Sequence, residues 1–155
     1  MAVSVQNEHS TGVRGWLLIL CLNITILDPL TMLLTVFFVT SATRPYFAEH
    51  PELFRLCLAS GVCRLALAVF SVYAGIALWR LVPGAPSVAK KYLLSVALYS
   101  VVAICLPLLV GVSKESYQEM AGQTFFNSLV TVAYATCWYL YLQRSRRVKA
   151  TYAGS

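Results

Sequence analysis

Four long apolar stretches divide this chain, and each is close to the length that a helix needs to cross a lipid bilayer. A transmembrane helix takes about 20 predominantly apolar residues. The four stretches cover Trp16–Val39, Leu56–Val82, Tyr92–Val112 and Phe125–Leu142. The sequence therefore predicts an all-α, integral membrane bundle of four transmembrane helices, which forms a single domain over residues 1–155.

The composition leaves little material for a water-exposed surface. Charged residues make up 12% of the chain and apolar residues 59%, whereas soluble domains carry about 25% charged residues. The four stretches and their connections use nearly all of the chain, so we expect no sizeable soluble domain. The first stretch is much longer than the roughly 7–15 apolar residues of a cleaved signal peptide, and it is interpreted as a retained span.

Positive charges lie mostly on one side of the predicted zigzag. The side with both termini and the middle loop holds eight Lys and Arg residues, and the other side holds Arg44, Arg55 and Lys114. Because cytoplasmic loops are enriched in Lys and Arg, we expect both termini in the cytoplasm.

A group of these cytoplasmic cations flanks the third and fourth spans. Near a membrane surface, each such cation attracts anionic lipid headgroups by about 1 kcal/mol, so the group is a candidate anionic-lipid contact. A topology signal without lipid binding explains the same cluster. The group consists of Lys90, Lys91, Arg144, Arg146, Arg147 and Lys149.

Prolines and aromatic residues predict where the helices bend and end. Asp28-Pro29 predicts a kink in the first span, and Pro51-Glu52 suits a helix start, so that the second helix could run from Glu52 to Val82. Residues 113–123 are expected to form an outer loop that could include a short interfacial helix. Aromatic side chains near the cytoplasmic ends are expected at the level of the lipid headgroups. These are Trp16, Trp79, Tyr92, Tyr139 and Tyr141.

Small and polar residues share one side of three predicted helices when residues are placed about 100° apart. Because helices in lipid associate through small residues and interhelical hydrogen bonds, we expect these three faces to meet in the bundle interior. The face of the first span contains Cys21, Thr25, Asp28, Thr31 and Thr35. The face of the second contains Cys57, Ser60, Gly61, Arg64, Ala68, Ser71 and Gly75. The face of the fourth contains Thr124, Ser128, Thr131 and Ala135.

Asp28 and Arg64 are charged residues that lie well inside the predicted spans, away from the ends. Counted from Arg14 and Arg80, they lie about 21 Å and about 24 Å along their helices at about 1.5 Å per residue. An isolated charge inside a bilayer is costly. The matched depths therefore predict that the two residues form an intramembrane polar pair.

Three interpretations of this pair stay open. It is an ion pair that sets the helix register, a functional station for a substrate or proton, or no pair at all, with Arg64 extending to the outer interface. On the fourth span, Asn127 and Ser128 reach a similar depth and are candidate supporting polar groups.

The residues that support metal, cofactor or hydrolytic chemistry are not arranged for it in the sequence. The five cysteines include no C-x-x-C pair, and the two histidines, His9 and His50, lie outside the spans. No H-E-x-x-H, G-x-S-x-G or phosphate-binding glycine loop occurs. We therefore expect no metal, no cofactor, no catalytic residue and no nucleic-acid partner, and we expect that the protein is not an enzyme.

Both ends of the chain resemble a known bacterial family. The segment from Gly12 to Leu18 looks like the family's opening G-x-G-G-W-L signature, with Arg14 where glycine is common, and Ser145–Tyr152 looks like its closing S-K-R-V-K-x-T-F motif. The family comprises small four-span inner-membrane proteins classed as domain of unknown function 2569. The resemblance covers nearly the whole chain and implies a multi-pass protein of the bacterial inner membrane. It implies no activity and no functional residues.

Two functions remain as hypotheses. The first is a non-enzymatic accessory or interaction component of a membrane assembly, which would bind another membrane protein. The second is a small oligomeric transporter or channel-like protein that uses Asp28 and Arg64. A homo-oligomer is expected for the second, because four helices enclose little volume.

Overall fold

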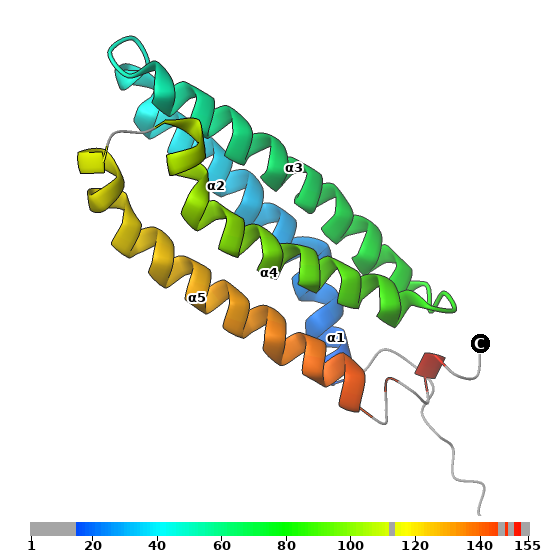
Figure 1. Cartoon of the computed structure of the whole chain (residues 1–155). Helices are drawn as coiled ribbons and strands as arrows, with labels where there is room; N and C mark the ends of the chain where they lie inside the picture. The colour runs from blue at the N-terminus through cyan, green and yellow to red at the C-terminus, as the bar shows by residue number, and fades with distance from the viewer. Residues whose placement is uncertain (1–14, 112–113, 146–147, 149–150, 153–155) are drawn as a thin grey trace, which may run out of the picture.

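The computed structural model describes residues 15–111, 114–145, 148 and 151–152, and these residues form helices and short turns without a strand. Four long helical rods run alternately up and down the bundle (Figure 1). The first rod joins three segments end to end and closes with a short 3₁₀ turn. The segments are α1 (Trp16–Leu22), the π-helical η1 (Asn23–Leu27), α2 (Asp28–Thr43) and the 3₁₀ turn η2 (Arg44–Tyr46). The other rods are α3 (Pro51–Trp79), α4 (Ala85–Val110) and α5 (Lys114–Arg144).

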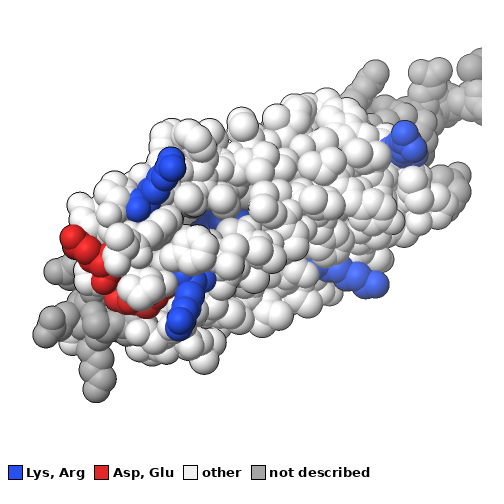
Figure 2. Space-filling model, turned by 90° about the horizontal axis from the view of Figure 1, so that it is seen from above, with Lys and Arg blue, Asp and Glu red and all other residues white. Residues whose placement is uncertain are grey.

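Three of the four rods are long and apolar enough to cross a membrane. They are Trp16–Tyr46, Pro51–Trp79 and Ala85–Val110, with mean hydropathies of 2.1, 1.9 and 2.5. The fourth, α5, is 31 residues long and packs along α4. Large apolar side chains point outwards from all four rods, including Phe37, Val69, Leu94 and Phe126. Figure 2 shows a side surface that is mostly uncharged, with acidic residues gathered near one end.

Helix boundaries agree with the predictions at some points and correct them at others. The second helix begins at Pro51, as predicted from Pro51-Glu52. Gly84 turns the chain between α3 and α4 with a φ of 84°, a left-handed conformation that glycine adopts without a steric cost. The segment 113–123 was expected to be an outer loop that could include a short helix; from Lys114 onwards it is helical and continuous with α5. Pro107 lies within α4, which continues to Val110.

The tightest packing lies towards the end of the bundle that holds α1 and the last residues of α5. The first rod, the end of α3, the start of α4 and the end of α5 contribute side chains with almost no exposed surface. The largest of these are Tyr92, Leu17, Leu20, Ile24, Leu78, Leu93 and Leu142. Burying a leucine-sized side chain contributes about 1.5–3 kcal/mol in water. Inside a bilayer, close packing takes over that role.

Gly75 lets the first rod approach α3 closely. A Cβ atom built on this glycine would lie 2.9 Å from the Thr25 Cα, which is closer than real Cβ atoms come to backbone. Glycine is therefore the residue that allows this contact. It sets how far α1 and α3 are offset along their axes.

Candidate functional site: a polar cavity among the helices

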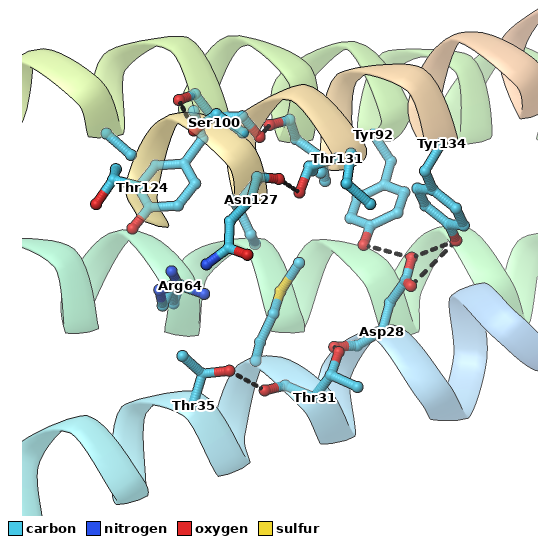
Figure 3. Close-up of a pocket in the computed structure, with 17 residues that line it drawn as sticks. Asp28, Thr31, Thr35, Arg64, Tyr92, Ser100, Thr124, Asn127, Thr131 and Tyr134 are labelled. Carbon is cyan, nitrogen blue, oxygen red and sulfur yellow. Dashed lines mark hydrogen bonds between the residues drawn. The ribbon is translucent and has the colours of Figure 1, made fainter. Parts of the chain in front are cut away.

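A cavity of about 370 Å³ lies among α2, α3, α4 and α5. Members of the polar faces predicted for the first, second and fourth spans line it, although the second span contributes only Arg64 from its predicted face. α4 completes the wall, with Tyr92, Tyr99 and Ser100 (Figure 3). The lining from the three predicted faces includes Asp28, Thr31, Thr35, Arg64, Thr124, Ser128 and Thr131.

Tyrosine hydroxyl groups hold the Asp28 carboxylate at one end of the cavity. Tyr92 donates a hydrogen bond of 2.9 Å to Oδ2, and Tyr134 donates across both oxygens at 3.1 and 3.2 Å. Asn23 in turn donates to the Tyr134 hydroxyl oxygen over 2.6 Å. Tyrosines from α4 and α5 thereby converge on one carboxylate (Figure 3), and Asn23 of η1 supports one of them.

The π-helical segment η1 has a local cause in the proline that follows Asp28. Pro29 has no N–H, so a carbonyl in the preceding turn loses its helical partner. In a π-helix, the residue at position 29 would donate its N–H to the Ile24 carbonyl, five residues back. Pro29 cannot do so, and the Ser71 hydroxyl of α3 donates to the Ile24 carbonyl in its place. The kink was predicted at Asp28-Pro29, and the structure has the π-helical segment directly before these residues. Such π-helical turns are frequent at functional sites.

Arg64 lines the same cavity from α3. Its guanidinium carbon lies 5.6 Å from the centre of the Tyr99 ring, at a distance typical of a cation–π contact. Among the described residues, no Asp or Glu lies within ion-pairing distance of Arg64. The guanidinium therefore retains donors for a further partner, since arginine carries five N–H donors.

The predicted ion pair between Asp28 and Arg64 is wrong, although both residues line one cavity. Asp28 lies at the level of Tyr92 and Arg64 at the level of Tyr99. Seven residues of helix separate the two tyrosines by about 10 Å.

The prediction from matched depths failed because the first rod and α3 do not end at the same level. α1 begins nine residues before Thr25, whereas α3 ends four residues after Gly75, against which Thr25 packs. At about 1.5 Å per residue, the first rod therefore extends about 7–8 Å further than α3 at this end. Arg14, the marker for the first span, lies outside the described residues.

Asn127 and Ser128, the predicted supporting groups, both line the cavity but do not bind Asp28. The Ser128 hydroxyl donates to the Ser100 carbonyl at 2.9 Å and joins α5 to α4. The Asn127 side-chain oxygen accepts from Gln123 at 3.2 Å. Figure 3 shows the Asn127 amide pointing across the cavity towards Arg64.

Two tyrosines at the site were missed by the sequence analysis. Tyr92 was expected at the headgroup level, but its side chain is fully buried and contacts Asp28. The spacing of Tyr92, Val96, Tyr99 and Ser100 along the third span could have indicated an inward face, since residues three or four apart share one side of a helix. Tyr134 follows Thr131 by three residues and Asn127 by seven, so the same spacing could have indicated its inward position.

The candidate lipid-binding cations are described only in part. Lys90, Lys91 and Arg144 lie at the same end of the bundle, at the start of α4 and the end of α5. The Lys90 ammonium lies 5.9 Å from the Tyr139 ring centre. Arg146, Arg147 and Lys149 lie outside the described residues, and lipid contact by the group stays a prediction.

The two end motifs of the sequence meet in the structure. Val148 is 2% exposed and belongs to the same packed cluster as Leu17. The Tyr152 hydroxyl donates to the Leu78 carbonyl at 2.8 Å, near the end of α3. Burial raises the pKa of Tyr152 above its ordinary value, so the hydroxyl keeps its proton at neutral pH.

This convergence gives the paired end motifs a structural reason. A protein family described as "Protein of unknown function (DUF2569)" matches the chain over residues 10–153. The chain belongs to this family. No curated protein and no solved structure matches it. Among the described residues, no group of three His, Cys, Asp or Glu side chains could hold a metal ion.

Proposed function

We propose that this DUF2569 protein binds a polar ligand inside the membrane, in the cavity between α2 and α5, as a small transporter-like unit. One observation carries the proposal. A cavity of about 370 Å³ contains a carboxylate and a guanidinium that do not pair with each other. Charged residues inside membranes are rare and mark ligand or ion pathways. No catalytic residue is assigned, and the protein is proposed not to be an enzyme.

The free-energy cost of placing Arg64 inside a membrane supports this role. An arginine at the centre of a membrane helix costs about 2.5–3.5 kcal/mol on insertion scales. A structural ion pair would offset that cost, but Asp28 is bound to tyrosines instead. A ligand with an anionic group would complete the partners of Arg64.

The shape of the bundle supports access from the side. α2 packs on α3, α3 on α4, and α4 on α5, whereas α2 and α5 have no extensive contact along their described lengths. The cavity lies between them, and Thr31 and Asn127 are exposed at its edges. A ligand could therefore enter from the membrane without crossing the packed end.

The proposal includes four crossings with both termini in the cytoplasm of a bacterium. α5 is long enough to cross, at about 46 Å for 31 residues, and it packs along α4, which is a span candidate. Its exposed Phe125, Phe126 and Leu129 suit lipid. Lys90, Lys91 and Arg144 would then mark the cytoplasmic side of the inner membrane, where anionic headgroups could bind them. A cytoplasm-dependent reporter fused after Ser155 should be active, and periplasmic activity would contradict the orientation.

Cysteine labelling tests whether the cavity admits water and polar ligands. In a variant without the five native cysteines, Thr131→Cys should react with a charged thiol reagent at least about tenfold faster than Leu129→Cys, because the reactive thiolate needs a polar surrounding. Leu129 is 58% exposed on the apolar outside of α5, so it is a matched control two residues away. Equally slow labelling of both would refute a water-accessible cavity.

An accessory role in a membrane assembly is the second candidate. Thr31 and Asn127 are exposed polar residues within membrane-length helices, and a partner helix could hydrogen-bond to them across the opening. Purification in mild detergent separates the candidates. A stoichiometric foreign membrane protein that is lost on Asn127→Leu would favour the accessory role, whereas a defined homo-oligomer would favour the transporter-like role.

A further inference from the structure

We infer, building on the proposed intramembrane binding site, that its ligand is the headgroup of a zwitterionic phospholipid. The phosphate would bind Arg64 and the ammonium group would bind Asp28. We assign the headgroup to a lipid and not to a soluble molecule, because the cavity opens sideways between two membrane-length helices.

The charges of the cavity set the charge pattern of the ligand. Its lining carries one formal cation, Arg64, and one formal anion, Asp28, and its other residues are uncharged. A ligand with only a negative charge would satisfy Arg64 but would face the Asp28 carboxylate. A ligand with both signs satisfies both ends, and the planar guanidinium fork matches phosphate oxygens in geometry.

Both charged groups have free capacity for such a ligand. Asp28 Oδ2 accepts from Tyr92 and Tyr134, whereas Oδ1 accepts from Tyr134 alone. Each carboxylate oxygen offers about two acceptor sites, so Oδ1 can accept a hydrogen bond from an ammonium group. Arg64 lies beside the Tyr99 ring, with its guanidinium carbon 5.6 Å from the ring centre, and its five N–H donors exceed what this one neighbour can use.

The two charges lie at different levels of the cavity, as a ligand with two separated charges requires. The tyrosines that they contact are about 10 Å apart along α4. A phosphate and an ammonium group joined by a short link, as in phosphatidylethanolamine, offer one charged group to each level.

The opening favours a lipid over a soluble solute. Thr31 lies on α2 and Asn127 on α5, so both edges carry polar groups for a headgroup. Leu30, next to Thr31, is 47% exposed, and Val130, an apolar residue of the cavity lining, is 52% exposed. A lipid could place its headgroup between the helices and leave its acyl chains in the bilayer.

Lipid retention by the full chain tests the inference. The protein is purified in mild detergent, mixed with equal amounts of phosphatidylethanolamine and phosphatidylglycerol, and its bound lipids are counted by native mass spectrometry. The wild type should retain phosphatidylethanolamine preferentially. Arg64→Gln should lower retention of both lipids about tenfold through loss of the charged fork, whereas Arg55→Gln, at an exposed position of the same helix, should retain them like the wild type.

Asp28→Asn separates a zwitterion from an anion. It should remove the preference for phosphatidylethanolamine while phosphatidylglycerol remains bound through Arg64. Thr131→Leu, which fills the cavity without a change in charge, should lower retention of both lipids and serves if Asp28→Asn does not fold. Equal retention of the two lipids by the wild type would overturn the inference.

Competition with a soluble headgroup distinguishes a lipid ligand from a free solute. Phosphoethanolamine at millimolar concentration should leave the bound lipid in place. Displacement of the lipid by this solute would overturn the lipid assignment. No lipid retention, together with rapid labelling of Thr131→Cys, would overturn this inference alone, whereas slow labelling would overturn the proposed function.

Discussion

Two regions of this bundle differ in how closely the same four rods pack. At the end that holds α1, apolar side chains such as Leu20 and Leu78 are fully buried, and Val148 and Tyr152 add to the packing. Further along, the helices separate around a cavity whose walls carry hydroxyl groups, an amide and two charges. The packed end buries apolar side chains, whereas the walls of the cavity hold polar groups, which are costly inside a membrane unless they find partners.

The largest loss of stability is expected from a substitution at the closest helix contact of the packed end. Gly75→Ala places a Cβ atom 2.9 Å from the Thr25 Cα, and relief of such overpacking costs about 1–3 kcal/mol or more. Thermal stability in detergent should fall clearly. Gly61→Ala is the control, because its Cβ would meet Val36 at an ordinary 3.8 Å. Equal stability of the two variants would contradict the close contact.

The next effect removes a partner of the charge at the edge of the packed region. Tyr134→Phe deletes the hydroxyl that donates to Asp28 and accepts from Asn23. Leaving such groups without a partner costs about 1–3 kcal/mol, measurable as a lower melting temperature. Tyr73→Phe, whose side chain is exposed, should melt like the wild type. An unchanged melting temperature of Tyr134→Phe would mean that the hydrogen bonds around Asp28 do not stabilise the bundle.

A smaller effect tests whether the two regions are independent. Tyr152→Phe removes the hydrogen bond to the Leu78 carbonyl, at a cost of about 0.5–1.5 kcal/mol. Stability should fall, whereas labelling of Thr131→Cys in the cavity should keep its rate. A change in that rate would show that the packed end controls the opening.

The smallest effect concerns the wall of the cavity itself. Ser128→Ala removes the hydroxyl that donates to Ser100 across α4 and α5, and interhelical hydrogen bonds in membranes average about 0.6 kcal/mol. Ser95→Ala is the matched control, because Ser95 donates within its own helix, to the Lys91 carbonyl. A drop in melting temperature of equal size for both would show that the bond between helices adds nothing.

The site could be predicted to the extent that it follows helix periodicity. Residues three and four apart share a face, so Asp28 and Thr31 were expected to point inwards, as was Arg64 on its own helix. The partners of these charges could not be predicted in the same way. Tyr92 and Tyr134 reach Asp28 only because α4 and α5 pack at one particular register, and aromatic residues near span ends are also common at the headgroup level.

By itself, the sequence determined the helices, their apolar exteriors and the sides that face inwards, because each of these follows from residue types at short and regular spacing. The family membership also rests on local motifs and on the spans between them. Only the tertiary structure decided the levels of Asp28 and Arg64. Those levels depend on the offset between the first rod and α3, which the contact of Gly75 with Thr25 sets. Helix periodicity specifies direction around an axis and carries no information about the offset between two axes, so two charges expected to neutralise each other stand apart across a cavity.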